Sequence, residues 1–77
     1  MISYKPLRHL LTEHGMSFSD LRDELKIGTN TNVKMKNDSG YVSLEVLDKI
    51  GNYFNKKTGK AITIQNLIEF VPDQPGE

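Results

Sequence analysis

One pattern recurs four times along this chain: an apolar residue, a serine or threonine directly after it, and a second apolar residue four positions further on. The copies begin at Ile2, Met16, Val42 and Ile62. In such a pattern the hydroxyl caps the first turn of a helix, and the two apolar side chains pack against each other across the cap. The sequence therefore predicts a series of short helices, one starting at each copy.

The first two copies open amphipathic helices. The first helix is expected over residues 3–15. The second is expected to start at Ser17, with Asp20 as a partner three residues after the cap, and to close at Lys26 or Gly28. The apolar residues that these two helices are expected to bury are Leu7, Leu10, Leu11, Phe18, Leu21 and Leu25.

The longest helix is expected from Ser43 to about Phe54, and its broad apolar face makes it the main core helix. The last copy, around Thr63, is open to two interpretations. It starts a short helix, or the alternating residues 61–64 form a strand. The apolar residues of these two segments are Val46, Leu47, Ile50, Tyr53, Phe54, Ile64, Leu67 and Ile68.

The segment TNTNVKMKN, residues 29–37, departs from this pattern because it has no such start signal and only two apolar residues, Val33 and Met35. It is either a polar loop or a surface helix that is kept polar for a ligand. Amide side chains pair with adenine, and lysines reach guanine edges or phosphates. With the helix before it and the short KIG turn between them, the segment is a candidate helix-turn-helix unit.

Composition narrows the class of protein. The 77 residues include no cysteine and carry zero formal net charge, and no apolar run exceeds two residues. Disulfides, thiolate metal sites and a membrane span are therefore not expected, and we expect a soluble, cytoplasmic protein. Residues 1–72 are expected to form one domain and residues 73–77 a flexible acidic tail. Three lysines and no acid lie within residues 26–37, so that segment is locally positive.

The order of these features resembles the helix-turn-helix transcriptional regulators related to phage Cro and the phage repressors. The resemblance covers residues 4–72 and is carried by GMSFSDLRDELKIGTNT, YVSLEVLDKI and NLIEFVPD. It implies an all-α, five-helix lambda-repressor-like DNA-binding domain. It also implies a homodimeric regulator, in the first place a repressor, that inserts the helix from Thr29 to Asn37 into the major groove of duplex DNA.

Four positions depart from the family pattern. Phe18 stands where a phosphate-contacting glutamine is frequent, and Arg22 stands where a small residue is common. Lys26 replaces the usual glycine of the turn. Asn32 occupies a position where an apolar core residue is expected, which indicates a shifted or irregular third helix.

The resemblance assigns the contacts with DNA by position. For Ser17, the alternative to a phosphate contact is a plain helix cap. For Lys34 and Lys36, the alternative to a contact with DNA is a solvated helix face. A second function is a helix-turn-helix fold that binds a protein, as an antirepressor, antitoxin or inhibitor. Base contacts are implied for Gly28, Thr29, Asn30, Thr31 and Lys34, and phosphate contacts for Ser17, Lys36, Asn37 and Ser39.

Other functions find little support in the sequence. His9 and His14 are five residues apart, a spacing that does not bring them to one helix face, so no metal site is expected. The sequence predicts no catalytic residue, no cofactor and no small-molecule ligand. Phe70 and Val71 are expected to pack across a dimer interface, and the alternative is that they close the core of a monomer.

Overall fold

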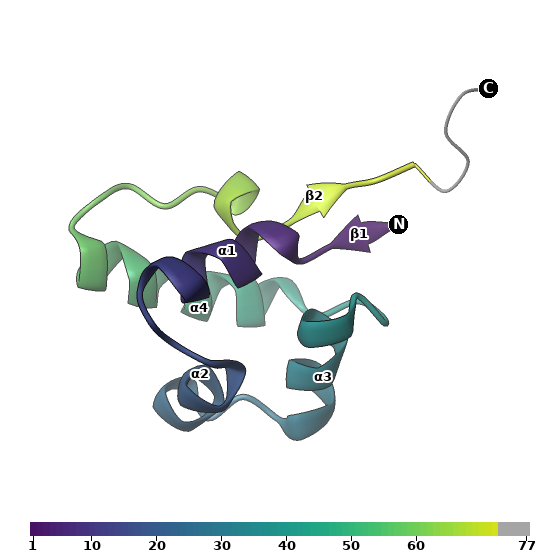
Figure 1. The fold of residues 1–77 in the computed structure, drawn as a ribbon, viewed down its shortest axis with the longest axis horizontal. Coiled ribbons are helices and arrows are strands. Elements are labelled where there is room, and N and C mark those ends of the chain that lie inside the picture. Colours follow the sequence, from purple (N-terminus) through teal and green to yellow (C-terminus); the bar gives the residue numbers. More distant parts are fainter. Residues whose placement is uncertain (73–77) are drawn as a thin grey trace.

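The computed structural model describes residues 1–72, and the expected acidic tail, residues 73–77, lies outside them. Figure 1 shows a mostly helical molecule in which α1 crosses in front of α4, with α2 and α3 below them. The two ends of the described chain lie side by side. In chain order the elements are β1 (Ile2–Ser3), α1 (Lys5–Glu13), α2 (Phe18–Leu25), α3 (Thr29–Asn37), α4 (Leu44–Thr58), the 3-10 helix η1 (Ile64–Asn66) and β2 (Glu69–Phe70).

A single apolar core joins these elements. Each α-helix sends at least one fully buried side chain into it, which is how helices too short to be stable alone hold together. The longest helix, α4, supplies three of these side chains and is the main core helix, as predicted. The buried apolar residues are Tyr4, Leu7, Leu11, Leu21, Ile27, Met35, Leu47, Ile50, Phe54 and Leu67.

Two of the predicted serine caps are confirmed. Ser17 Oγ accepts the backbone N–H of Asp20 at 3.2 Å, and the Asp20 carboxylate accepts the N–H of Ser17 at 3.0 Å, which forms a complete capping box. Ser43 Oγ accepts the N–H of Val46 at 3.3 Å. These helix starts depend on contacts within four residues, so the local sequence is enough to determine them.

The predicted cap at Ser3 is wrong. Ser3 lies in β1, and α1 starts at Lys5 with Tyr4 at the cap position. The backbone N–H of Tyr4 is accepted at 2.7 Å by the carboxylate of Asp38, which is 34 residues away. Ser3 Oγ still accepts the N–H of Lys5, the first residue of α1, at 3.2 Å. Ser3 therefore lies one residue before the cap position, and its backbone pairs with β2.

The expected count of five helices is also wrong. The described residues contain four α-helices, and the predicted fifth is replaced by the single 3-10 turn η1. Asn66 Oδ1 accepts the N–H of Thr63 at 2.9 Å and so closes this one turn. After it the chain extends and pairs antiparallel with β1, with Ile2 opposite Phe70. Residues 61–64 form no strand.

The third helix is regular, contrary to the irregularity indicated by Asn32. It runs without interruption from Thr29 to Asn37. Asn32 Nδ2 donates to the carbonyl oxygen of Phe18 at 3.0 Å, so the amide links α3 to α2 where an apolar contact was expected. Asn32 Oδ1 is buried and accepts no hydrogen bond from the residues that the structure describes.

Candidate nucleic-acid interface

The helix-turn-helix unit consists of α2, α3 and a three-residue turn between them. Lys26 ends α2 in the left-handed conformation, with φ of 55°, and Ile27 follows as a buried residue that anchors the turn in the core. Gly28 takes the cap position of α3. Lysine therefore adopts the backbone conformation that glycine usually supplies at a helix end.

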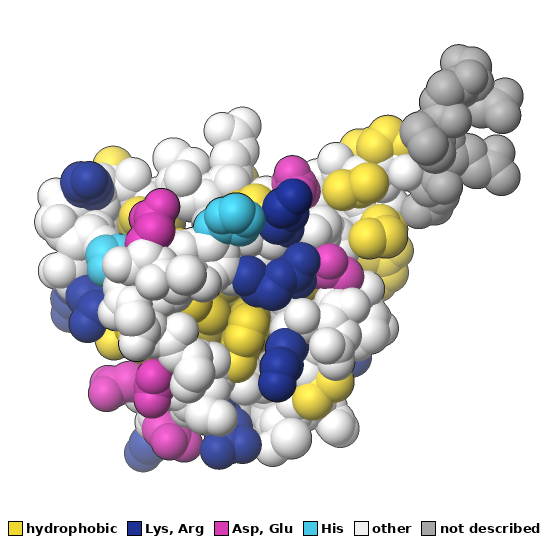
Figure 2. All heavy atoms as spheres, viewed as in Figure 1, with side chains coloured by type: hydrophobic (Ala, Val, Ile, Leu, Met, Phe, Trp, Pro, Cys, Tyr) yellow, Lys and Arg dark blue, Asp and Glu magenta, His cyan; other side chains and the backbone are white. Residues whose placement is uncertain are grey.

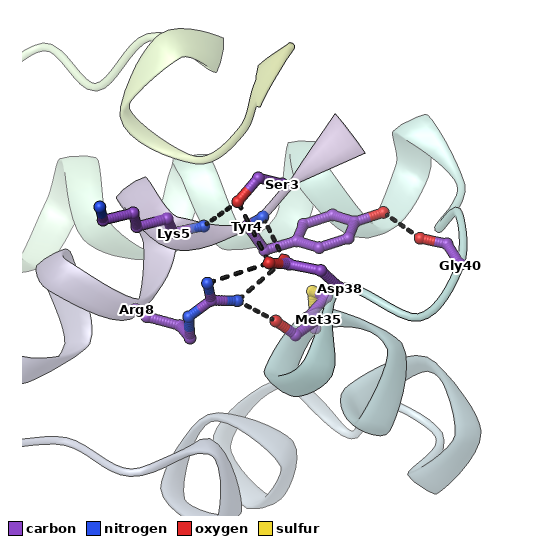
Figure 3. Close-up of polar contacts among 7 residues, drawn as sticks. All are labelled: Ser3, Tyr4, Lys5, Arg8, Met35, Asp38 and Gly40. Atoms are coloured by element: carbon purple, nitrogen blue, oxygen red, sulfur yellow. Dashed lines mark hydrogen bonds and ion pairs between the residues drawn. The ribbon is translucent and has the colours of Figure 1, made fainter. Parts of the chain in front are cut away.

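The C-terminal end of α3 is held by Asp38, which also has a left-handed backbone, with φ of 54°. Figure 3 shows its carboxylate between the guanidinium of Arg8 and the backbone N–H of Tyr4. The two Arg8–Asp38 contacts measure 2.8 and 3.0 Å, and Arg8 also donates to the carbonyl oxygen of Met35 at 3.2 Å. These bonds tie α3 to the first turn of α1.

The same contacts change the titration of Asp38. The hydrogen bond from Arg8 lowers the pKa of this carboxyl to about 2, against the opposing effect of its partial burial. The N–H of Tyr4 also lowers the pKa, and the value of about 2 includes its effect. Asp38 is therefore ionised in the folded protein at every physiological pH, and the pair is bidentate, which adds geometric specificity to its strength.

The outward face of α3 is polar and carries no acid. With about 100° between successive residues of a helix, Thr29, Val33 and Asn30 follow one another around this face. All three are exposed, whereas Met35 on the opposite side is fully buried. The last turn adds Lys36, also exposed.

Two of the predicted base-contacting residues lie away from the centre of this face. Thr31 is half-buried, and so is Lys34. A Cβ added to Gly40 would lie 3.1–3.3 Å from three stem carbons of Lys34. The stem therefore packs along the loop after α3, and the absence of a side chain at Gly40 makes room for it.

A groove runs between α2 and α3. Arg22 and Lys36 place two cations in its wall, and Ser17 stands at one end. Because Asp20 already accepts the N–H of Ser17, that N–H is not available to a phosphate, although the hydroxyl hydrogen of Ser17 is. The lining residues are Ser17, Phe18, Ser19, Arg22, Thr29, Asn32, Val33 and Lys36.

Charge is unevenly distributed around the unit. On the face drawn in Figure 2, acidic side chains gather over α2 with basic side chains below them, and further basic side chains lie over α1 and α3. The exposed acids of α2 are Asp20, Asp23 and Glu24, whereas α3 has Lys34 and Lys36 and no acid. The zero net charge therefore conceals a positive α3 beside an acidic α2.

The remaining residues predicted to contact DNA lie at the two ends of α3. Gly28 precedes α3, and Asn37 and Ser39, both exposed, stand on either side of Asp38 at its other end. Sequence reasoning treated Val33 only as an apolar residue, although the structure exposes 44% of it at the centre of the polar face. The spacing of four residues puts Val33 on the same side of the helix as Thr29, and the burial of Met35 shows that this side faces outward.

The residues considered for other chemistry do not assemble into a site. The ring of His14 packs against Phe54, with 5.6 Å between the ring centres. Within residues 1–72, no group of three or more histidine or carboxylate side chains is arranged to hold a metal ion. The same residues include no helix of the length and hydrophobicity required to span a membrane.

Comparison with known families identifies the class. A family model for the Cro/C1-type helix-turn-helix DNA-binding domain matches residues 6–73 of the 77. The chain belongs to this family, which agrees with the resemblance noted from the sequence. No curated protein and no solved structure matches it.

Proposed function

We propose that this protein binds a specific duplex DNA sequence and regulates transcription, acting as a repressor. The observation that carries the proposal is the outward face of α3, a polar helix without acids beside a groove with two cations. A helix of this kind fits the major groove, which is about 12 Å wide. Membership of the Cro/C1-type family supports the same function.

The proposal gives each predicted residue a role. Thr29, Asn30 and Lys34 contact base edges, and Gly28 and Thr31 flank them. An asparagine amide forms two hydrogen bonds with adenine, so Asn30 is the residue best suited to read one base pair. The phosphate contacts are assigned to Ser17, Lys36, Asn37 and Ser39. These are the hydroxyl, amide and ammonium groups at the two ends of the helix-turn-helix unit, where the backbone of a bound duplex would pass.

The regulator is proposed to act as a homodimer on a two-fold symmetric operator. The half-sites would then lie about 34 Å apart, one turn of the duplex. The proposal is supported by Phe70, which is 71% exposed on the edge strand β2 next to the exposed Met1. Figure 2 shows hydrophobic side chains gathered at this end of the molecule. A bound dimer would repress by excluding other proteins from the promoter.

Selection from a pool of random duplexes tests the proposal. The wild-type protein is expected to enrich one sequence, and its affinity should fall steeply with rising salt as contacts with phosphates release counterions. Asn30→Ala should cost about 1–3 kcal/mol at one base pair and relax the preference there. Lys36→Ala should weaken all duplexes alike and reduce the salt slope by about 1.

The two variants serve as controls for each other because both side chains are exposed on α3. If neither changed binding to the enriched site, α3 would not be the element that reads DNA. If no sequence were enriched at any salt concentration, the alternative of a protein-binding module would gain support. The observation that favours this alternative is the pair Tyr41 and Leu44, 72% and 77% exposed before and at the start of α4.

A further inference from the structure

The side chain of Val33 lies outside the apolar core. Of the two apolar residues of α3, Met35 is fully buried, and Val33 is 44% exposed and does not pack against the core. A β-branched residue is also a weaker helix former than alanine. Neither packing in the core nor helix propensity therefore explains a valine at this position.

The neighbours of Val33 are the residues proposed to meet DNA. Around the helix axis it lies about 40° from Thr29 and about 60° from Asn30, so it stands between them on the outward face. It also lines the groove that contains Arg22 and Lys36. An apolar side chain thus occupies the middle of a polar, positively charged surface.

We infer that Val33 is a specificity-determining residue that packs against the 5-methyl group of a thymine in the major groove. This inference rests on the proposed function and extends it to one base. The thymine methyl is the largest apolar group that base edges present in the major groove, where the amino groups, carbonyl oxygens and N7 atoms donate or accept hydrogen bonds. Valine has no polar atom in its side chain, so it favours the methyl group and offers nothing to the amino group of cytosine.

The size of the effect follows from the size of the group. Burial of one methyl group strengthens association by about fourfold. A cytosine at the same position has no 5-methyl group and would not make this contact. Its amino group would find no hydrogen-bond acceptor on the side chain of Val33. We therefore expect the enriched operator to contain a thymine at one fixed position in each half-site.

The experiment removes the methyl group from the DNA and the valine from the protein in turn. In the operator obtained by selection, each thymine is replaced singly by deoxyuridine, which pairs in the same way and lacks the 5-methyl group. Wild-type protein should bind one of these duplexes about fourfold more weakly. Val33→Ser should bind this deoxyuridine duplex and the unmodified operator with equal affinity. Val33→Ile should again bind the unmodified operator more tightly.

Folding and local specificity have separate controls. Because Val33 is exposed, Val33→Ser should keep its melting temperature within about 4 °C of the wild-type value. Asn30 is proposed to read a different base edge. Asn30→Ala should therefore retain the full difference in affinity between the thymine and deoxyuridine duplexes at the position assigned to Val33.

The outcomes separate this inference from the function on which it rests. If selection yields no specific operator, the proposed function fails. If an operator is found but contains no thymine sensitive to loss of its methyl group, the inference is overturned and the proposed function stands. The same conclusion follows if Val33→Ser keeps the fourfold difference.

Discussion

The carboxylate of Asp38 joins three segments of the chain at the end of α3. It accepts hydrogen bonds from Arg8, from the hydroxyl of Ser3 and from the backbone of Tyr4. Its left-handed backbone lets the chain turn out of α3 while the side chain points back toward α1. The ion pair with Arg8 therefore fixes the far end of the proposed DNA-reading helix, whereas Met35 and Asn32 hold its middle.

This ion pair should make stability depend on pH in the acid range. The pKa of Asp38, about 2 in the folded protein, lies below the ordinary value of 3.8. As pH falls, the unfolded chain takes up a proton first. The ionised carboxylate thus stabilises the fold above about pH 4, and this stabilisation is lost as the pH falls toward 2.

Asp38→Asn tests this linkage, since asparagine tolerates the left-handed backbone and still accepts the N–H of Tyr4. We expect the variant to be less stable than the wild type by roughly 1–2 kcal/mol at pH 6, because Arg8 is partly exposed to solvent. The gap should close near pH 2. Urea unfolding across this range measures it, with the exposed Asp23→Asn as control. A gap that stays constant with pH would falsify the assignment.

At the scale of the element, the turn between α2 and α3 is strained at one residue. Lys26 holds φ at 55°, and its side chain is exposed. A residue with a Cβ pays a steric cost in this region, whereas glycine does not. The left-handed backbone at Lys26 therefore lowers the stability of the folded protein.

Lys26→Gly should therefore stabilise the protein by about 0.5–1 kcal/mol. The opposite substitution provides the matched control. Gly59 ends α4 with φ of 69° and has open space around it, so Gly59→Ala adds backbone strain without a clash. It should destabilise by about 1 kcal/mol. Thermal or urea unfolding compares the two variants, and a loss of stability in Lys26→Gly would contradict the account of the turn.

At the scale of the whole molecule, the two ends of the chain meet in a small sheet beside the exposed Phe70. The C-terminal apolar residues divide between two roles. Leu67 is buried and closes the core, and Val71 is half-buried, with its N–H donating to Met1 at 2.8 Å. Phe70 faces solvent from β2 and is the most exposed of these residues, so it is available to a second copy of the chain.

The dimer proposal predicts that Phe70→Ser separates the protomers without unfolding them. Sedimentation at micromolar concentration should show a dimer for the wild type and a monomer for the variant, with equal helix content. The variant should also lose affinity for the full operator while its affinity for a single half-site stays unchanged. A wild-type protein that remains monomeric both alone and on DNA would remove the interface and leave the DNA-binding proposal intact.

The sequence by itself determined the features that depend on neighbours in the chain. The sequence predicts the caps at Ser17 and Ser43 and the end of α2 at Lys26, because each is satisfied within a few residues. It also predicts the buried face of α4, because the apolar residues there recur at helical spacing. The family was also recognisable, since the segments that carry the resemblance follow one another along the chain in the family's order.

The tertiary structure alone decided the features that depend on distant partners. The cap position of α1 moved from Ser3 to Tyr4 because Asp38 accepts the N–H of Tyr4 and β2 offers Ser3 a strand partner. The expected fifth helix became one 3-10 turn because the chain after it pairs with β1. The exposure of Val33 was likewise undecided until Met35 was seen to take the core position, because a helix of mostly polar residues has little periodicity to orient it.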